Sequence, residues 1–470
     1  MKAVVRTYTH WHQRWSAWAV AAVALGAGAG SVIGLAQGVE APSSPATAAS
    51  SAGAPRTLIP VPPAPATARN PQLVRGEYLA QAGDCISCHT RPKGAPFAGG
   101  LPLTTPFGTI ISTNITPDKE QGIGNYTLED FTRALREGKA ADGHHLYPAM
   151  PYTNFARLRD TDLQSLYAYF MQGVPPQKQD NPKTELAWPF SMRGLMAGWN
   201  LLYLRSKPYE DTAAQSAEWN RGAYLVQGLG HCSACHTPRS FTGAEKASTE
   251  KGELFLSGAV IDGWYAQPLR NTAEPGLGTW SVQEIAQYLK TGRTAHTAAF
   301  GAMAEVVGNS TQHLSMEDLT AIGTYLKSIG DEPGVVTAVV RSTTDPTAAA
   351  LRNGEVSKPG AMVFVNNCAA CHRSNGEGAQ RTFPSLARSS TVAAKDSSSL
   401  IRIVLEGSAM PHTKEAPSQL GMPSLGWRLT DANVADVLTF VRSSWGNQAP
   451  AVSADEVAKV RTATGKQAGR

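Results

Sequence analysis

The 470-residue sequence has few charged side chains, which make up 17% of it, against roughly a quarter in average proteins. It shows no basic run, although its net charge is +5, and this absence argues against a nucleic-acid-binding protein. The motifs of dinucleotide-binding, P-loop and nucleophile-elbow enzymes are missing as well. Hydrophobic residues nevertheless make up 42%, which is enough to build cores and excludes a disordered chain. At roughly 100–200 residues per domain, the length indicates about three domains.

Only one stretch is apolar enough to enter a membrane, and it lies near the N-terminus. Residues 15–36 form an Ala/Gly-rich run that follows Lys2, Arg6 and Arg14. Such a run of about 20 residues is long for a signal peptide and just long enough to span a bilayer. Residues 1–36 are therefore predicted to be a cleaved signal peptide or a retained N-terminal membrane anchor, and either one exports the rest of the chain. A flexible Pro- and Ala-rich linker is predicted at 37–70.

All six cysteines belong to three copies of one motif, Cys-x-x-Cys-His. This motif is typical of covalent haem c attachment. The two thiols form thioethers with the haem vinyl groups, and a two-residue spacer on a helical turn places both sulfurs along one porphyrin edge. The next residue can then bring its imidazole to the iron. The predicted haem-binding cysteines are Cys85, Cys88, Cys232, Cys235, Cys368 and Cys371, and the predicted iron ligands are His89, His236 and His372.

Other uses of paired cysteines explain the pattern less well. A thioredoxin-like redox pair needs no histidine after it. Structural zinc needs four ligands, usually from two nearby pairs, whereas Cys85, Cys232 and Cys368 are far apart in the sequence. A disulfide framework would suit an exported protein, but it does not explain three histidines at one fixed offset. The pattern therefore predicts three haems c.

The three motifs lie in a repeated sequence unit. Residues 122–127 (Gly-Ile-Gly-Asn-Tyr-Thr) match residues 276–281 (Gly-Leu-Gly-Thr-Trp-Ser). The segments that follow predict matching helices over 128–137 and 282–291, which end at Gly138 and Gly292. The predicted fold class is therefore all-α, with three tandem cytochrome c-type haem domains. The predicted domains are 71–205, 206–330 and 359–447, with a linker at 331–358 and a polar tail at 448–470.

Methionine is the expected sixth ligand of each iron, because small cytochrome c domains commonly bind it through a methionine sulfur. Each unit should offer that methionine in a loop before its last helix. Met316 is disfavoured, because Ser315 and Asp318 predict a helix start that includes it. The predicted ligands are Met150, Met303 and Met422; the rivals are Met171, His144 and His145 in the first unit, Met316, His296 and His313 in the second, and Met410 in the third.

With these residues in place, the chain resembles the triheme cytochrome c subunits of bacterial membrane-bound dehydrogenase complexes that oxidise alcohols, aldehydes, gluconate or fructose. The resemblance covers about residues 71–447. It rests on the stretches 112–117, 122–127, 146–152 and 235–239. One departure is that Asn114 corresponds to Pro268 in the second unit, so any polar contact of Asn114 near the first haem has no counterpart there.

The resemblance implies an electron-transfer subunit without a catalytic site of its own. Electrons would pass through three haems c from a catalytic subunit, which carries a flavin, pyrroloquinoline quinone (PQQ) or a molybdenum cofactor, towards ubiquinone or the respiratory chain. A small subunit is a further expected partner, and no nucleic acid is. The expected location is the periplasmic side of the bacterial inner membrane, in association with the membrane surface. Some members of this family have a C-terminal membrane helix, and none is expected here.

Residues 188–204 are a candidate for membrane contact. Leu195, Trp199 and Tyr203 fall on one face of a predicted helix, with basic residues nearby. The helix is interpreted either as an amphipathic segment at the membrane interface or as a linker packed between the first two units.

A different functional class is a periplasmic multihaem enzyme, such as a peroxidase-like cytochrome. Such an enzyme needs an open or displaceable sixth position on one iron. A candidate methionine in every unit favours electron transfer instead. An electron carrier to a terminal oxidase is a further alternative, with the same chemistry and other partners.

Overall fold

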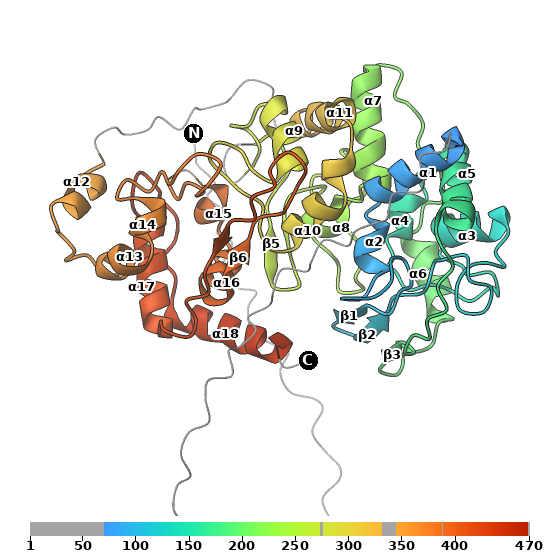
Figure 1. Ribbon diagram of the computed structural model, residues 1–470, viewed down its shortest axis with the longest axis horizontal. Coiled ribbons are helices and arrows are strands. Elements are labelled where there is room, and N and C mark those ends of the chain that lie inside the picture. Colours follow the sequence, from blue (N-terminus) through green and yellow to red (C-terminus); the bar gives the residue numbers. More distant parts are fainter. Residues whose placement is uncertain (1–69, 273–275, 331–344, 388, 469–470) are drawn as a thin grey trace, which may run out of the picture. The chain divides into compact units, whose positions relative to one another are not determined.

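The computed structural model describes residues 70–272, 276–330, 345–387 and 389–468 (Figure 1). All of these residues belong to Ser51–Arg470, one of the two units into which the chain divides. The predicted signal peptide or anchor at 1–36, residues 37–69 of the predicted linker and residues 331–344 of the second linker lie outside the described residues.

The first repeat, 71–205, combines short helices with one small sheet. Its elements are α1 (Pro71–Ala82), α2 (Cys85–Cys88), β1 (Pro102–Thr105), β2 (Gly108–Ile111), α3 (Leu128–Glu137), α4 (Tyr152–Phe155), α5 (Asp160–Ala168), the π-helical turn η1 (Tyr169–Gly173), β3 (Glu185–Leu186) and α6 (Leu195–Tyr203).

The second repeat, 206–330, follows the same order of elements up to its last helix. Its elements are α7 (Ala217–Tyr224), η2 (Leu225–Leu229), α8 (Ser233–His236), β4 (Ala259–Ile261), β5 (Trp264–Ala266), α9 (Val282–Thr291), α10 (Gly301–Asn309), η3 (Thr311–His313) and α11 (Met316–Lys327).

The third repeat, 359–447, is shorter and is flanked by one helix on each side. The elements from this part of the chain are α12 (Thr347–Arg352), α13 (Ala361–Asn367), α14 (Ala369–His372), α15 (Ser390–Ala393), α16 (Ser398–Glu406), β6 (Ser408–Ala409), β7 (Gly421–Met422), α17 (Asp431–Arg442) and α18 (Ala454–Ala468).

The predicted helices over 128–137 and 282–291 are confirmed as α3 and α9. A capping box starts each helix: the Thr127 hydroxyl and the Asp130 carboxylate pair with each other's backbone N–H before α3, and Ser281 and Glu284 do the same before α9. Each helix ends at the predicted glycine, Gly138 or Gly292, which adopts a left-handed conformation at φ 62° and 70°. These local signals suffice to fix both ends.

The prediction of an all-α chain of three tandem domains is wrong. Each repeat carries a short antiparallel sheet, in the order β1-β2-β3, β4-β5 and β6-β7. Strands of two to four residues are too short to show the alternation by which a strand is recognised in a sequence. In addition, one hydrophobic cluster extends over repeats one and two, from residue 79 to residue 329, and a second one covers residues 361–457. The first two repeats therefore share a core instead of forming separate domains.

The expected polar tail at 448–470 is helical over most of its length. Helix α18 packs against α16 and α17, which lie beside it in Figure 1. The Val457 side chain is fully buried, and the Arg461 guanidinium forms an ion pair with Asp431 at 2.7 Å. Two buried valines, Val452 and Val457, and this ion pair thus help to hold a segment whose mostly polar composition gave little sign of packing.

Repeats one and two are joined by a reciprocal set of hydrogen bonds. Within repeat one, the Arg75 guanidinium pairs with Asp162 at 2.9 Å, and the Tyr224 hydroxyl of repeat two donates to the same carboxylate at 2.7 Å. Repeat two has the mirror arrangement: Arg221 pairs with Asp318 at 2.7 Å, and the Tyr78 hydroxyl of repeat one donates to Asp318. Each carboxylate therefore has an arginine from its own repeat and a tyrosine from the other.

The hydrogen bonds of this network keep Asp318 ionised. Burial alone would raise the pKa of the Asp318 carboxyl, but the hydrogen bonds from Arg221 and Tyr78 outweigh burial and lower it. Burial raises the pKa of the Tyr78 hydroxyl, which therefore stays a donor. A group with a lowered pKa adds stability that is present above its unfolded pKa and is lost as the pH falls through its folded pKa.

Replacing Tyr78 by phenylalanine is expected to lower the free energy of unfolding by about 1.5–3 kcal/mol, because Asp318 loses a donor to a buried charged group. The matched control is Tyr167→Phe, whose hydroxyl donates to a neutral acceptor, the Tyr126 carbonyl, at 2.9 Å within repeat one. That control should cost about 1 kcal/mol. Denaturant unfolding of the haem-loaded protein measures both. Equal losses of unfolding free energy in the two variants would show that the hydrogen bond from Tyr78 to Asp318 stabilises the protein no more than an ordinary one.

Candidate haem-binding sites

The three Cys-x-x-Cys-His motifs adopt the same backbone turn. The N–H of His89 donates to the Cys85 carbonyl at 3.0 Å. The same bond joins His236 to Cys232 at 3.0 Å and His372 to Cys368 at 2.9 Å. One helical turn thus spans each motif, as the two-residue spacer predicts. In all three, the carbonyl of the histidine accepts from a later glycine, namely Gly99, Gly258 or Gly378.

The imidazole ring of each motif histidine also forms a hydrogen bond with a backbone carbonyl. The Nδ1 atom of His89 lies 2.7 Å from the Thr113 carbonyl oxygen. The equivalent distances are 2.6 Å from His236 to Gln267 and 2.9 Å from His372 to Pro384. A carbonyl oxygen can only accept, so Nδ1 carries the proton and Nε2 keeps its lone pair. This is the bonding by which a protein orients an imidazole towards a metal ion.

Burial determines the protonation of the candidate groups. It lowers the pKa of His89, His236 and His372, although the carbonyl contact partly opposes the shift, so the imidazoles are neutral and able to bind a metal. Burial raises the pKa of the thiols of Cys85 and Cys232 to about 12. It raises the pKa of Cys235 and Cys368 to about 11. These four thiols lack the low pKa of a redox-active cysteine pair.

The cysteines fit a covalently bound porphyrin better than the rival uses. Cys88 and Cys371 are exposed, and the other four cysteines are half-buried. Over the described ranges, no group of three or more His, Cys, Asp or Glu side chains is close enough to hold a metal ion, which is what a zinc site of this chain would need. The lone pair on Nε2 of each imidazole could bind the haem iron, and the two thiols of the same motif could form the thioethers that haem c requires.

Met150 and Met422 lie in the surroundings expected of iron ligands. Met150 is partly buried against the hydrophobic cluster that Cys85 also contacts, in a turn just before α4. Met422 packs against the second cluster, as Cys368 does, and lies in β7 before α17. Met410 is more buried than Met422, but it is not part of that cluster. In the third repeat, Met422 therefore shares a hydrophobic cluster with Cys368, and Met410 does not.

Met303 lies in a different kind of element from the one expected. It is the third residue of α10, so it is helical and not in a loop. Helix α10 begins after Phe300 and packs against α2, the first motif. Its neighbour Gly301 lies directly against the Trp264 ring, and its φ of 54° is one that glycine adopts readily. The expectation that the methionine ligand lies in a loop before the last helix is therefore wrong for Met303.

The rival ligands of the first two repeats lie in varied surroundings. Met171 packs against the core, and His144 pairs with Asp142 at 2.6 Å near the surface. His145 has a buried Nδ1 without a partner in the structure. In repeat two, Met316 is the first residue of α11, as Ser315 and Asp318 predict, and is 45% exposed.

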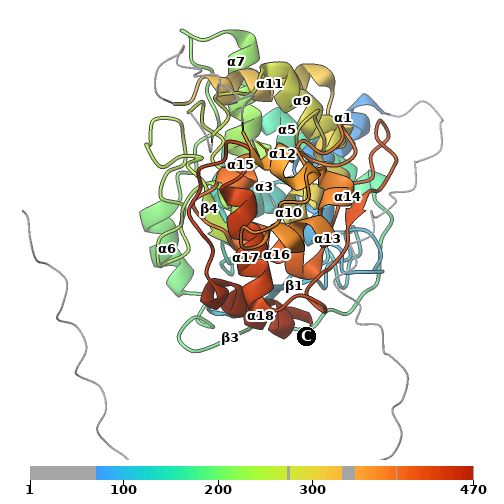
Figure 2. The same ribbon diagram turned by 90° about the vertical axis from the view of Figure 1, so that its left-hand side faces the viewer.

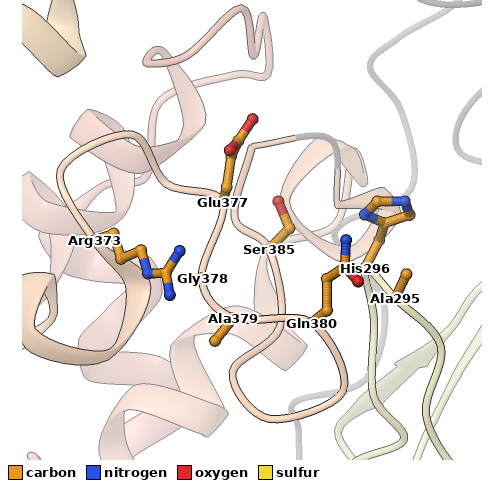
Figure 3. A pocket seen from close by; sticks show the side chains of 8 residues that line it. All are labelled: Ala295, His296, Arg373, Glu377, Gly378, Ala379, Gln380 and Ser385. Atoms are coloured by element: carbon orange, nitrogen blue, oxygen red, sulfur yellow. The ribbon is translucent and has the colours of Figure 1, made fainter.

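His296 lines a cavity of about 360 Å³ beside the third motif (Figure 3). In this view His296 lies on the side opposite Arg373, the residue that follows His372. The backbone confirms that repeats two and three meet here, because the N–H of Ser385 donates to the His296 carbonyl at 2.9 Å. His296 thus faces the junction with repeat three.

Each of the first two motifs is contacted by one asparagine of the other repeat. No local sequence pattern indicates these two contacts. Asn309, at the end of α10, donates to the hydroxyl of Ser87 inside the first motif at 3.0 Å. Asn154 of α4 donates to the hydroxyl of Ser233 inside the second motif at 2.8 Å. The first motif therefore contacts α10, which contains Met303. The second motif contacts α4, which follows Met150.

Asn114 has a structural role that Pro268 cannot take over. Its side chain donates to the Gln177 carbonyl at 2.7 Å and accepts from the backbone N–H and the hydroxyl of Thr116. These bonds tie the segment after Thr113, the partner of His89, to the segment near Gln177. The departure at this position thus concerns loop anchoring in repeat one.

Known proteins resemble this chain over most of its length. The family model for cytochrome c matches residues 357–445, which is the third repeat. A gluconate 2-dehydrogenase cytochrome c subunit from Pantoea cypripedii is 49% identical over 82% of this chain and 89% of its own length. The cytochrome c subunit of an alcohol dehydrogenase (quinone) from Gluconobacter oxydans is 48% identical over 83% and 82%. A fructose dehydrogenase cytochrome subunit from Gluconobacter japonicus is 42% identical over 87% and 86%.

These relatives share their subunit type, although their names give three different substrates. Identity of 42–49% over more than four-fifths of both chains is well above what a shared fold alone would require. Their names describe cytochrome subunits and not catalytic ones. The chain belongs to the family of electron-transferring cytochrome c subunits of dehydrogenase complexes.

Proposed function

We propose that this chain binds three haems c covalently and relays electrons from a dehydrogenase catalytic subunit towards ubiquinone. The observation that supports this proposal best is the threefold recurrence of one arrangement. In each repeat a helical turn spans Cys-x-x-Cys-His, and the histidine ring is held by a backbone carbonyl. The family model matches the third repeat only, so the count of three rests on this recurrence.

In the proposed sites, Cys85 and Cys88, Cys232 and Cys235, and Cys368 and Cys371 form the thioethers. His89, His236 and His372 would bind the irons, and Met150, Met303 and Met422 would supply a second protein ligand to each. Haem c supplies reversible one-electron chemistry when it is bound. The chain holds each imidazole in one tautomer through the backbone carbonyl of Thr113, Gln267 or Pro384.

The proposed partners follow from the relatives and from the N-terminal sequence. The catalytic subunit would carry a flavin, PQQ or a molybdenum cofactor, with a small subunit as a further partner. The word quinone in the name of one relative supports ubiquinone as the acceptor. The export signal predicted at 1–36 supports the periplasmic side of the inner membrane, in contact with the membrane surface.

Replacing each candidate methionine by leucine is expected to lower the midpoint potential of one haem, because methionine sulfur favours the reduced iron. Each change should also remove about a third of the methionine–iron charge-transfer absorption, if all three irons have methionine. Redox titration followed by visible spectroscopy measures both for Met150→Leu, Met303→Leu and Met422→Leu.

Every repeat offers a matched control for this series, namely Met171→Leu, Met316→Leu and Met410→Leu. These should leave all three potentials in place. A lost band in Met410→Leu, with the band retained in Met422→Leu, would reverse the assignment in repeat three. Strong carbon monoxide binding by the reduced wild-type protein would instead indicate an open iron and favour a haem enzyme.

A further inference from the structure

Exposed apolar side chains are concentrated in one short segment of repeat one. Of the fifteen large apolar side chains that are exposed in the described part of the chain, six lie between residues 188 and 202. They are Trp188, Phe190, Met192, Leu195, Leu201 and Leu202, which we call the α6 patch. Contiguous exposed apolar surface of this kind marks a site of contact with another molecule or a membrane.

One face of α6 is fixed to the body of the protein. The Trp199 indole donates to the Thr242 carbonyl of repeat two at 3.1 Å. The Asn200 amide donates to the Glu137 carbonyl of repeat one at 3.0 Å and accepts from the Tyr152 hydroxyl at 2.8 Å. Trp199 and Asn200 therefore lie on the inner face, where a linker helix between the two repeats would place them. The Tyr203 ring packs against the Trp199 ring, and both side chains are half-buried.

The opposite face of α6 is apolar. Leu201 is 81% exposed and Leu202 is 64% exposed, and a Cβ added at Gly198 would meet no other atom within 4 Å. A helix on a protein surface normally turns polar side chains to the solvent. Figure 2 shows α6 at the edge of the described structure. Nothing in the described part of the chain buries the side chains of Leu201 and Leu202, so another molecule or a membrane is expected to do so.

The charges around the α6 patch indicate what binds to it. From residue 186 to residue 209 the sequence has three basic residues, Arg193, Arg205 and Lys207, and no acidic one. Lys207 pairs with Glu210 at 3.0 Å, whereas the exposed Arg205 donates only to carbonyls at the end of α6. Leucines flanked by tryptophan and arginine are typical of segments that lie in the headgroup region of an anionic bilayer.

We propose that α6 lies flat in the headgroup region of a bilayer, with Leu201 and Leu202 inserted and Trp188 and Arg205 at headgroup depth. Nine residues rise only about 14 Å, so α6 cannot cross a bilayer. Among the helices of the described residues, none has the length and apolar character that crossing a bilayer requires. The proposal deepens the proposed function, on which it rests, because electron delivery to a quinone takes place at the membrane.

Amide hydrogen exchange of the haem-loaded full chain tests the proposal, because it reports on α6 separately from any N-terminal anchor. Vesicles of mixed anionic and neutral phospholipid should slow exchange in α6. The double variant Leu201→Gln with Leu202→Gln should lose this protection and bind vesicles roughly tenfold more weakly once the 1–36 segment has been removed. Neutral vesicles should protect α6 less than anionic ones.

A matched pair of tryptophans serves as the control. Trp188 and Trp427 are 80% and 81% exposed, and only Trp188 belongs to the α6 patch. Trp188→Gln should weaken vesicle binding, and Trp427→Gln should not. An α6 whose exchange is unchanged by vesicles would overturn the proposal. So would protection that appears only when the catalytic subunit is bound, since that result assigns the patch to a protein interface.

The haem-related function is measured separately. The Leu201→Gln, Leu202→Gln variant should keep the haem content and the potentials of the wild type, because no patch residue belongs to the proposed haem sites. A haem content below three per chain in the wild-type protein would refute the proposed relay, whatever the vesicle experiments show. A normal haem content without vesicle protection would refute only the membrane contact.

Discussion

The double variant Cys368→Ala, Cys371→Ala is expected to carry two haems per chain in place of three, because the chain has three attachment motifs and this change removes both thioethers of one. Haem that is held only by axial ligands can dissociate, whereas thioether-bound haem cannot. A pyridine haemochrome titration against protein concentration measures the ratio. The acid–acetone extract of the variant should be colourless, because the remaining haems stay covalently bound.

The same variant should also weaken the third repeat. His372 is only 9% exposed and Cys368 packs against the second hydrophobic cluster, so the site is part of the core of this repeat. Without haem, that core has a cavity, and such cavities cost several kcal/mol. The region 361–457 should therefore unfold at lower denaturant concentration, while the shared core of repeats one and two unfolds as before.

Two further variants sharpen the haem count. Cys85→Ala with Cys88→Ala should also lose one haem, since the motif at 85–89 has the same turn. Ser87→Ala is the matched control inside the motif: it removes hydroxyl contacts with Asp84 and Asn309 but leaves both thiols, so the count should stay at three. Loss of all haem from either double variant would mean that maturation of the whole chain, and not one site, had failed.

Local signals made some parts of the structure predictable. The helices α3 and α9 could be placed to the residue, because a capping box begins each and a left-handed glycine ends each. The helical turn of each Cys-x-x-Cys-His motif was predictable for a similar reason, since the spacing itself requires it. In these places the information lies within about ten residues of sequence.

Other features depend on contacts that no local pattern shows. The carbonyl that holds each motif histidine lies 24, 31 or 12 residues further along the chain, at three different residue types. Strands such as β6 and β7 exist only because a neighbouring strand pairs with them. The spacing within α6 likewise left two interpretations open, a membrane-facing helix or a packed linker, and only the hydrogen bond from Trp199 to Thr242 in repeat two shows that this side of the helix is packed.

The tight helix crossing in repeat two leads to the largest expected change in stability. The first and last helices of that repeat, α7 and α11, pack so closely that Gly222 has no room for a side chain. A Cβ on Gly222 would lie 2.8 Å from the Cβ of Tyr325 and even nearer to the Ala321 carbonyl oxygen. Gly76 of α1 is in the same situation against Ser165 and Tyr169 of the first repeat.

Gly222→Ala is expected to lower the free energy of unfolding by about 3 kcal/mol, because α7 and α11 must separate to admit the methyl group. Helix propensity works in the opposite direction, since alanine is favoured over glycine by about 1 kcal/mol in a helix interior. The steric overlap dominates, because the atom that is met is a backbone carbonyl and cannot rotate away. Repeat one should also lose stability, because α7 carries Tyr224, whose hydroxyl donates to Asp162 of repeat one.

Gly198→Ala provides the matched control, since Gly198 also lies inside a helix but would meet nothing within 4 Å. This change should stabilise the protein by roughly 0.5–1 kcal/mol. Denaturant unfolding of the two haem-loaded variants therefore gives shifts of opposite sign. A Gly222→Ala protein as stable as the wild type would show that α7 and α11 are not in close contact.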